Sequence, residues 1–533
     1  MDRLEKKRLR STLFCHLDGI AMAPTVSTLH HGGIIEYILK YPHFSFQELS
    51  REFEFNGGYL NVSLRLLASQ GWLERKILKD GEELDFKLTE KGGGTFPLSH
   101  HYVEFCQYLP TLINIDQYLF EKHDQKKEEY FLQLTTELRS LKSKYSDLSI
   151  PVGEMIRHLE GLLVGPILVA LGMSDFFTEI LNSDATIEDK IIDDFPFIKS
   201  VISFFTMLKW IENNRFTNEG QFFMRRAVAY GVTVSYLPTF MQTQELLFGN
   251  PNKLWKRTPE GLETHVNRRM NVWGSGGAHS LYFKKIDEIV IHIFNQPLQD
   301  QPVGIADMGC GDGTLLKHLY NVVKDKTLRG KHLDEYPLNI IGADFNKAAR
   351  LASSITLKDS GIKYSILAGD ISDPASYANS LQVEFGMDLR QMLNVRSFLD
   401  HNRIYTPPKK PFHNRICHST GAFAFRGRWI PNNELKQNLV EHFSAWRDYV
   451  NKFGLLILEL HTIDHILAAA NLGNTLATAY DGTHGYSDQY IFEVDTMLSA
   501  AKEAGLIADP KYQARFPNDK LTTISINLFR STI

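Results

Sequence analysis

The chain has 533 residues, of which 43% are hydrophobic and 23% charged, and its formal net charge is −4. These are globular values, and the length exceeds what one hydrophobic core supports, so we expect two to four domains. The weakly negative charge argues against a dominant nucleic-acid-binding surface. The N-terminus is basic without a long apolar core, and no apolar run reaches about 18 residues, so we expect neither a secretory signal nor a membrane span. The cysteines lie far apart, without the spacing of a zinc site or a disulfide framework, which favours a reducing cytoplasm: Cys15, Cys106, Cys310 and Cys417.

Two segments in the first half of the chain resemble each other. HLDGIAMAPTVSTLHHGGIIEYI, from His16, and HLEGLLVGPILVALGMSDFFTEI, from His158, share His, Leu, an acid, Gly and a later Pro at one fixed offset. Each is followed by an apolar helical pattern with a tryptophan, Trp72 or Trp210, and then by FKLTEKG or RFTNEG. We therefore predict a duplicated helical unit, each copy ending in a helix, a short strand pair and a turn. The copies are assigned the ranges 1–150, which includes a charged linker helix, and 151–262.

Each copy resembles a winged-helix module, which can read DNA or pack as a lid. A DNA-reading helix needs Arg and Lys on its exposed face. The first candidate helix, NGGYLNVSLRLLASQG, offers only Arg65, and the second offers Lys199 and Lys209. This composition favours a packing role, in which the apolar helices either pair with a second subunit, giving a homodimer, or cover an acceptor pocket.

A glycine-rich segment introduces the third domain, which we assign to residues 263–533. In HVNRRMNVWGSGGAHSLYF, Gly274 and Gly276 follow Trp273. A flexible segment before the first strand can fold over one end of a bound cofactor. A plain interdomain turn is the alternative.

The stretch GIADMGCGDGTLL, from Gly304 to Leu316, is the most informative part of the chain. An apolar run ending in Asp307 leads into Gly309 and Gly311, and an apolar helical pattern follows. The stretch predicts a buried strand, a tight glycine turn and a helix start, in which glycine lets the backbone approach a nucleotide-like ligand. The spacing G-x-G-x-G after an acid differs from the dinucleotide pattern G-x-G-x-x-G. It resembles motif I of the class I S-adenosylmethionine (SAM) methyltransferases.

The next two predicted strands also end in acids. LNIIGADFN ends at Asp344, and an acid there suits the two ribose hydroxyls. YSILAGDISDP places Asp370 and Ile371 at a strand end, and in methyltransferases such a pair touches the adenine amine and ring. Strand-end acids at this spacing predict an open α/β sheet with a ligand at its carboxyl edge, although an unrelated α/β sheet with chance carboxylates is the alternative.

Two further strands carry candidate acid–base groups. MDLRQMLNVRSFL predicts a strand, and His401 in the charged stretch after it could take a proton near neutral pH. Arg396 and Arg403 could hold an acidic substrate, or the whole stretch could be a capped turn with surface charge. GLLILELHTIDH predicts a buried strand ending in Glu459 and His461, and His461 is a second candidate base or a structural residue.

A final block, AYDGTHGYSDQYIFEV, contains His484 and Gln489 in what we predict to be a Gly-rich aromatic loop. An imidazole and an amide oxygen make a sparse divalent-metal site with open positions. Those positions would suit a malonyl group, whose enolate the metal would stabilise as a Lewis acid. The alternative is a turn in which His484 makes loop hydrogen bonds.

The order NVWGSGGAH, ADMGCGDGT, GADFN, GDISDP, VRSFLDHNRIY, GAFAFRGRW, ELHT and DGTHGYSDQY resembles the C-methyltransferase domains of polyketide synthase loading modules. Those of apratoxin and saxitoxin assembly, and the related 2-oxo-acid C-methyltransferases, form the group. The resemblance runs from roughly Thr264 onward, and the duplicated region is similar to their lid. It implies a Rossmann-like α/β core after a mostly helical lid, and methylation at the α-carbon of a malonyl-type thioester on an acyl carrier protein. In the metal-dependent members a His and a Gln hold the ion, which implies Fe²⁺ or Mn²⁺ at His484 and Gln489.

One departure from the family is the lack of the Asp/Glu-Ser-Leu pattern of a carrier domain, so the acid substrate is either carrier-bound in trans or a free small molecule. We expect SAM across the glycine turn and either His461 or His401 as the base. Three alternatives remain: a metal-independent O- or N-methyltransferase for a small metabolite, a SAM-sensing winged-helix regulator, and a catalytically silent domain.

Overall fold

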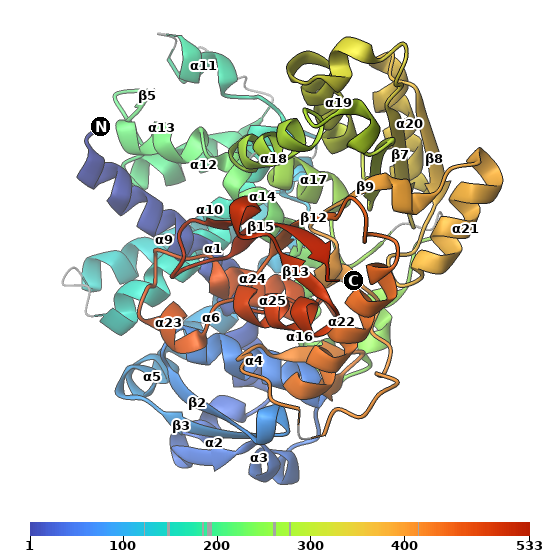
Figure 1. Ribbon diagram of the computed structural model, residues 1–533. Coiled ribbons are helices and arrows are strands. Elements are labelled where there is room, and N and C mark those ends of the chain that lie inside the picture. The colour runs from blue at the N-terminus through green and yellow to red at the C-terminus, as the bar shows by residue number, and fades with distance from the viewer. Residues whose placement is uncertain are drawn as a thin grey trace.

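The computed structural model describes residues 1–121, 123–145, 150–183, 186–188, 195–259, 263–276, 279–413 and 415–532. The N-terminal half is mostly helical, and the C-terminal half contains an open sheet with helices on both sides (Figure 1). The boundary that we predict between residues 262 and 263 adjoins residues 260–262, which lie outside the described residues.

Two long helices, one from each copy of the duplicated unit, form the centre of the helical half. They are α1 (Arg3–His31) and α10 (Ile150–Met173). At their crossing, a Cβ on Gly19 would lie 2.3 Å from the Cα of His158, and a Cβ on Gly161 would lie 2.4 Å from the Cα of His16. The contact is reciprocal between the two copies, and glycine at both positions is what lets the helix backbones approach this closely.

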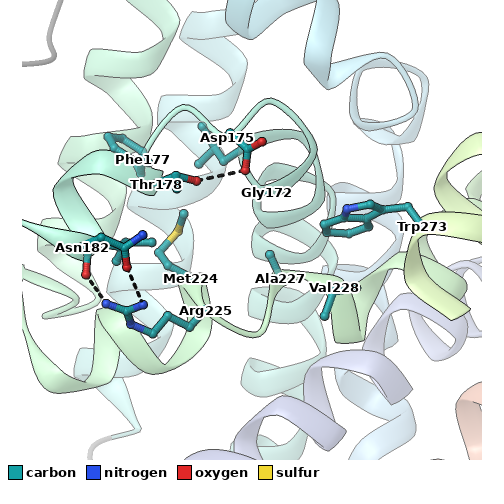
Figure 2. A pocket seen from close by; sticks show the side chains of 12 residues that line it. Gly172, Asp175, Phe177, Thr178, Asn182, Met224, Arg225, Ala227, Val228 and Trp273 are labelled. Atoms are coloured by element: carbon teal, nitrogen blue, oxygen red, sulfur yellow. Dashed lines mark hydrogen bonds between the residues drawn. The ribbon is translucent and has the colours of Figure 1, made fainter. Parts of the chain in front are cut away.

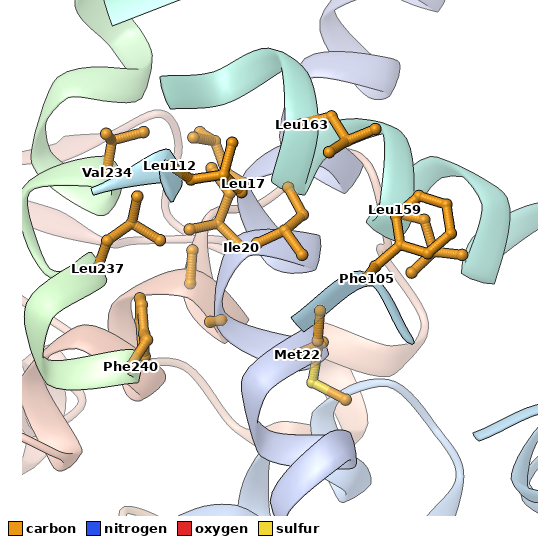
Figure 3. Packing of buried hydrophobic residues seen from close by; sticks show 14 of the residues in the cluster. Leu17, Ile20, Met22, Phe105, Leu112, Leu159, Leu163, Val234, Leu237 and Phe240 are labelled. Atoms are coloured by element: carbon orange, nitrogen blue, oxygen red, sulfur yellow. The ribbon is translucent and has the colours of Figure 1, made fainter. Parts of the chain in front are cut away.

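The same two histidines also form hydrogen bonds between the two copies. A hydrogen bond of 2.9 Å joins His16 Nδ1 to the hydroxyl of Tyr230 in the second copy. The matching bond, also 2.9 Å, joins His158 Nδ1 to the hydroxyl of Tyr102 in the first copy. The duplicated units therefore pair within one chain. Figure 3 shows the apolar side chains that pack around this pairing, among them Leu17, Ile20, Met22, Leu159, Leu163 and Val234.

Helix α10 is also the one described helix that is long and apolar enough to cross a membrane, judged by length and composition. Its apolar window is 89% buried inside the protein, which is the environment of a core helix.

Each copy ends in a helix and a two-stranded wing. In the first copy α4 (Gly57–Ser69) precedes β2 (Leu73–Leu78) and β3 (Glu83–Leu88), to which β1 (His43–Ser45) adds a strand. In the second copy α12 (Pro196–Met207) precedes β4 (Ile211–Glu212) and β5 (Arg215–Phe216). After each wing a glycine, Gly92 or Gly220, lies against the carbonyl oxygen of the tryptophan that follows the helix, Trp72 or Trp210. The sequence prediction of a duplicated winged-helix-like lid is confirmed by these matching units.

The C-terminal sheet has the strand order β13-β15-β12-β9-β6-β7-β8, and β14 pairs with β15. Strands β8, β7, β6, β9 and β12 are parallel, and β15 is antiparallel to β12. The order reverses between β6 and β9, which is the point where open α/β sheets bind ligands. The bounds are β6 Gly304–Met308, β7 Asn339–Asp344, β8 Tyr364–Ala368, β9 Met392–Ser397, β12 Leu455–Leu460, β13 Leu506–Ala508, β14 Ala514–Phe516 and β15 Ile524–Ser531.

Apolar helix faces cover both sides of this sheet. One core includes α18 (His279–Ile293), α19 (Thr314–Lys326) and α20 (Lys347–Asp359). The other includes α21 (Pro374–Phe385), α22 (Asn432–Arg447) and α25 (Val494–Glu503). Burial of both sheet faces explains why the parallel strands are continuous apolar runs.

The glycine-rich segment before the sheet differs from the expected flexible cover or turn, because residues Arg268–Gly276 form helix α17. A Cβ on Gly274 would lie 2.4 Å from the backbone nitrogen of Val232, so this glycine allows α17 to pack closely on α14 (Gly231–Ser235). Gly276 has open space around it. The neighbouring Gly277 lies outside the described residues.

Candidate cofactor and acceptor site

The glycine turn follows β6 at the carboxyl edge of the sheet. Gly309, Gly311 and Gly313 have φ values of +80°, +54° and +81°, a region that favours glycine. The N–H groups of Gly309 and Cys310 donate to the carbonyl of Ala343, and the Gly311 N–H donates to Asp344 Oδ2 at 3.2 Å. The turn is thereby fixed against the end of β7, and no atom lies within 4 Å of a Cβ placed on Gly311.

Three strand-end acids lie along this edge, as the register of β6, β7 and β8 requires. Asp344 also accepts the N–H of Asn346 at 2.7 Å, and burial raises its pKa. Asp307 is buried, and burial together with the Asp344 charge raises its pKa well above the usual value. Its Oδ1 is buried and has no hydrogen-bond partner among the described residues. Asp370 lies after β8 and accepts the N–H of Ser372 at 2.8 Å.

Ile371, the next residue after Asp370, is apolar and lies at the same edge of the sheet. It is buried, and its carbonyl accepts the indole N–H of Trp446 at 2.7 Å. The structure thus brings together Asp307, Asp344 and Asp370 with the glycine turn, but places Gly274 and Gly276 in a helix before the sheet.

A buried histidine and glutamate form a dyad farther along the same edge. His401 Nδ1 donates to Glu459 Oε1 at 2.6 Å, and the His401 backbone N–H donates to Glu459 Oε2 at 3.1 Å. Glu459 lies in β12, one residue before its end, and both side chains are buried. A carboxylate on Nδ1 fixes the tautomer and leaves Nε2 as the proton acceptor. The sequence indicated Glu459 only as a strand-end residue, because its partner is 58 positions away.

The second candidate base, His461, is held on both ring nitrogens. Its Nδ1 donates to the carbonyl of Phe492 at 3.0 Å, and its Nε2 accepts from the hydroxyl of Ser525 at 2.7 Å. Burial lowers its pKa to about 4. These bonds give His461 a structural role and leave His401 as the better placed base.

His484 lies in helix α24 (Ala477–Gly485), where we expected a loop. Its Nδ1 donates to the carbonyl of Tyr480 at 2.9 Å, burial lowers its pKa to about 3, and its ring centroid lies 5.1 Å from that of His401. Gln489 donates through Nε2 to the hydroxyl of Tyr236 in the lid at 3.0 Å, which leaves Oε1 as an acceptor. Among the described residues no group of three or more His, Cys, Asp or Glu side chains could hold a metal ion.

The charged residues around His401 form a buried network. Arg396 Nη1 donates to Asp400 at 2.5 Å, and His442 Nε2 lies 2.9 Å from the same oxygen. Burial opposes ionisation of Asp400, but Arg396 and His442 hold its pKa well below the usual value. Arg403 donates to the carbonyl of Asp400 at 2.8 Å, and its Nη2 has no partner among the residues described.

This network borders a cavity of about 10 Å³ that Arg403, Tyr490, His401 and Glu459 line. Its size is that of one water molecule. A larger cavity of about 390 Å³ lies elsewhere, between the second copy of the lid and Trp273 of α17 (Figure 2). It is lined by Gly172, Phe177, Met224, Arg225 and Trp273, among others, and contains none of the strand-end acids.

The strand order, the glycine turn and the acids at successive strand ends define a SAM-dependent methyltransferase of class I. Residues 263–527 match the AprA MT2-like domain family, residues 9–75 the AprA N-terminal domain and residues 160–250 the AprA winged helix domain. The C-terminal half is therefore an AprA MT2-like methyltransferase domain, and it follows an AprA N-terminal domain and an AprA winged helix domain.

Three solved structures that resemble the chain are distant from it in sequence. An O-methyltransferase family 2 protein from Planctomyces limnophilus is 11% identical, with 98% of this chain and 96% of that chain covered and a TM-score of 0.39. The CurJ carbon methyltransferase is 12% identical, with 76% and 99% covered and a TM-score of 0.34. The citrinin polyketide synthase CMeT domain is 10% identical, with 75% and 95% covered and a TM-score of 0.35. No curated protein sequence matches the chain.

Proposed function

We propose that this enzyme methylates the α-carbon of a malonyl-type thioester or a similar acid in polyketide or related secondary metabolism. The observation that carries the proposal is the buried His401–Glu459 dyad at the carboxyl edge of the sheet. Carbon methylation needs a base that removes a C–H proton, and a histidine oriented by a carboxylate supplies one. The free Nη2 of Arg403 supports an acidic acceptor, because a buried guanidinium favours an anionic partner.

In this proposal each group has one task. Asp344 holds the ribose of SAM, and Asp370 with Ile371 contacts the adenine. His401 Nε2 takes the α-proton of the acceptor, and Glu459 stabilises the imidazolium that forms. When bound, SAM would supply its sulfonium methyl group to the enolate carbon, with S-adenosylhomocysteine (SAH) as the leaving group. Burial of the dyad excludes water and orients the reacting atoms.

His484 and Gln489 supply two of the donor atoms that a divalent-metal site needs. The hydrogen bond to Tyr480 presents a neutral imidazole with Nε2 free, and Gln489 has Oε1 free. These residues would hold Fe²⁺ or Mn²⁺ with several positions open for substrate oxygens, where the ion would stabilise an enolate.

If the metal takes part, chelation is expected to lower turnover at least about tenfold, and Fe²⁺ or Mn²⁺ to restore it. H484A and Q489A should lose both turnover and tight metal retention, which metal analysis of the purified proteins measures independently of activity. Chelator-resistant turnover with unchanged rates in both variants would instead support the alternative, a metal-independent O- or N-methyltransferase. The two-residue donor set is the observation that keeps this alternative open.

A SAM-sensing DNA-binding regulator is the weaker alternative. Every residue from Gly58 to Ser69 of α4 is buried, and α4 packs on the catalytic domain. The helix that would read DNA is therefore covered.

The proposal is tested by incubating the protein with methyl-labelled SAM and a panel of free and carrier-bound malonyl, methylmalonyl and 2-oxo acids. Label in a new carbon–carbon bond, located by mass spectrometry or NMR, is the expected result. Transfer only to oxygen or nitrogen acceptors, or no transfer to any carbon acid, would reject it.

A further inference from the structure

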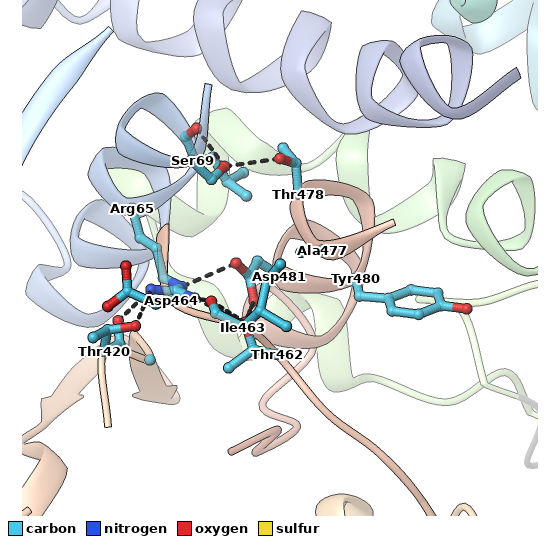
Figure 4. Close-up of polar contacts among 12 residues, drawn as sticks. Arg65, Ser69, Thr420, Thr462, Ile463, Asp464, Ala477, Thr478, Tyr480 and Asp481 are labelled. Atoms are coloured by element: carbon cyan, nitrogen blue, oxygen red, sulfur yellow. Dashed lines mark hydrogen bonds and ion pairs between the residues drawn. The ribbon is translucent and has the colours of Figure 1, made fainter. Parts of the chain in front are cut away.

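The lid and the catalytic domain meet at a buried arginine, Arg65, on helix α4. Arg65 is 1% exposed and makes five hydrogen bonds, which matches the five N–H donors of a guanidinium. Nε donates to Asp481 Oδ2 at 2.9 Å, and Nη2 donates to Thr462 Oγ1 and to the carbonyl of Ile463, each at 2.8 Å. Nη1 donates to the carbonyl and the hydroxyl of Thr420 (Figure 4).

Its partners belong to the segments that carry the acceptor site. Thr462 lies three residues after Glu459, just beyond the end of β12. Asp481 lies in α24, three residues and about one helical turn before His484. Thr462 Oγ1 donates to Asp481 Oδ1 at 2.6 Å, so Arg65, Thr462 and Asp481 form a closed triangle.

A guanidinium with these hydrogen bonds restricts the position of the segment after β12 and of helix α24 at the same time. A planar guanidinium fixes the directions of its bonds, which a lysine ammonium with three rotatable donors does not. The triangle is also buried, and removing Arg65 would take away the ion-pair partner of Asp481. No other arginine or lysine is recorded in an ion pair with Asp481 among the described residues.

We propose that Arg65 is a positioning residue, through which the lid holds the end of β12 and helix α24 at the separation that the His401–Glu459 dyad and His484 require. The inference rests on the proposed function in one respect, that these residues form the acceptor site. It assigns the lid a part in the chemistry beyond covering the pocket, and it predicts that Arg65 affects turnover without affecting SAM affinity.

Arg75 supplies a matched control. It is a second buried lid arginine, in β2, and donates to the carbonyl of Thr420 at 2.8 Å and to Asn61 at 2.9 Å. None of its recorded hydrogen bonds reaches Thr462 or Asp481. R75M therefore removes a comparable buried charge from the same domain without releasing the triangle.

The test compares R65M, R65K and R75M by steady-state kinetics, SAH calorimetry and hydrogen exchange. R65M is expected to lower kcat at least about tenfold while the KM for SAM and the SAH affinity stay within about twofold, and R65K to restore only part of kcat. Hydrogen exchange should become faster in residues 461–464 and 477–486. R75M should keep kcat within about threefold and show no faster exchange in these segments.

Equal loss of kcat in R65M and R75M, or unchanged exchange in a folded R65M protein, would overturn the proposal. If R65M does not fold, D481N gives the second test, because it keeps an acceptor for Nε without the buried charge. D481N should lower kcat and make hydrogen exchange faster in the same segments. If its kcat and its exchange matched those of the original enzyme, the positioning role of Arg65 would be rejected. Hydrogen exchange and SAH binding can be measured without a methyl acceptor. Absence of carbon methylation would therefore count against the proposed function, but not against the positioning role of Arg65.

Discussion

Replacing His401 by Ala, or Glu459 by Gln, is expected to lower methyl transfer by about 10²- to 10⁴-fold, the contribution of a positioned general base. In the first variant no group accepts the α-proton. In the second, the tautomer and orientation of the imidazole are lost, because Glu459 accepts from both the ring and the backbone N–H of His401. Single-turnover transfer from labelled SAM measures the effect, and SAH affinity should stay within about twofold.

A suitable control is H318Q. His318 lies on α19, is partly exposed and pairs with Asp287 at 2.6 Å, away from the dyad. The methyl-transfer rate of H318Q should match that of the unaltered enzyme. Near-normal transfer in a folded H401A protein would remove His401 from the mechanism and with it the observation on which carbon methylation depends.

The second large effect concerns stability. G19A and G161A should each destabilise the lid by about 3 kcal/mol, at the upper end of overpacking costs, because the added methyl group meets the backbone of the opposing helix. The two losses should be similar, since the contacts of Gly19 and Gly161 are reciprocal. Thermal and urea unfolding, followed by helical circular dichroism, measure them.

Gly93 gives the matched substitution in the same domain. It lies inside helix α5 (Glu90–Thr95), and nothing lies within 4 Å of a Cβ placed on it. G93A should be neutral or stabilising by up to about 1 kcal/mol, the gain in helix propensity. If G19A and G161A behaved like G93A, the close pairing of α1 with α10 would be incorrect.

The sequence was sufficient to predict the sheet and its cofactor edge because local signals coincide there. Apolar runs end in Asp307 and Asp344, and the glycine turn and the following helix are adjacent in the chain. The duplication was also visible, since the offset of His16 and His158 is regular. Their reciprocal packing could not be predicted, because a repeat in sequence does not specify how its copies pair.

Long-range contacts account for what the sequence did not predict. Gly482 and Gly485 suggested a loop around His484, but they lie in α24 because the lid packs there, against Ala21 and Val62. Tertiary contact overrode local propensity. Arg65 is a similar case. The sequence showed it only as the single basic residue of a helix too poor in Arg and Lys to read DNA, because its partners lie more than 350 residues away in the chain.

The glycine turn and the acid at the end of β7 are expected to bind the SAM donor. Isothermal titration of SAH into the unaltered protein and into D344A measures this binding. The prediction is clear binding to the unaltered protein and an affinity at least about 100-fold weaker in D344A, since two hydrogen bonds to a charged group contribute about 3 kcal/mol or more. No heat of binding in the unaltered protein, or equal affinity in D344A, would contradict the account.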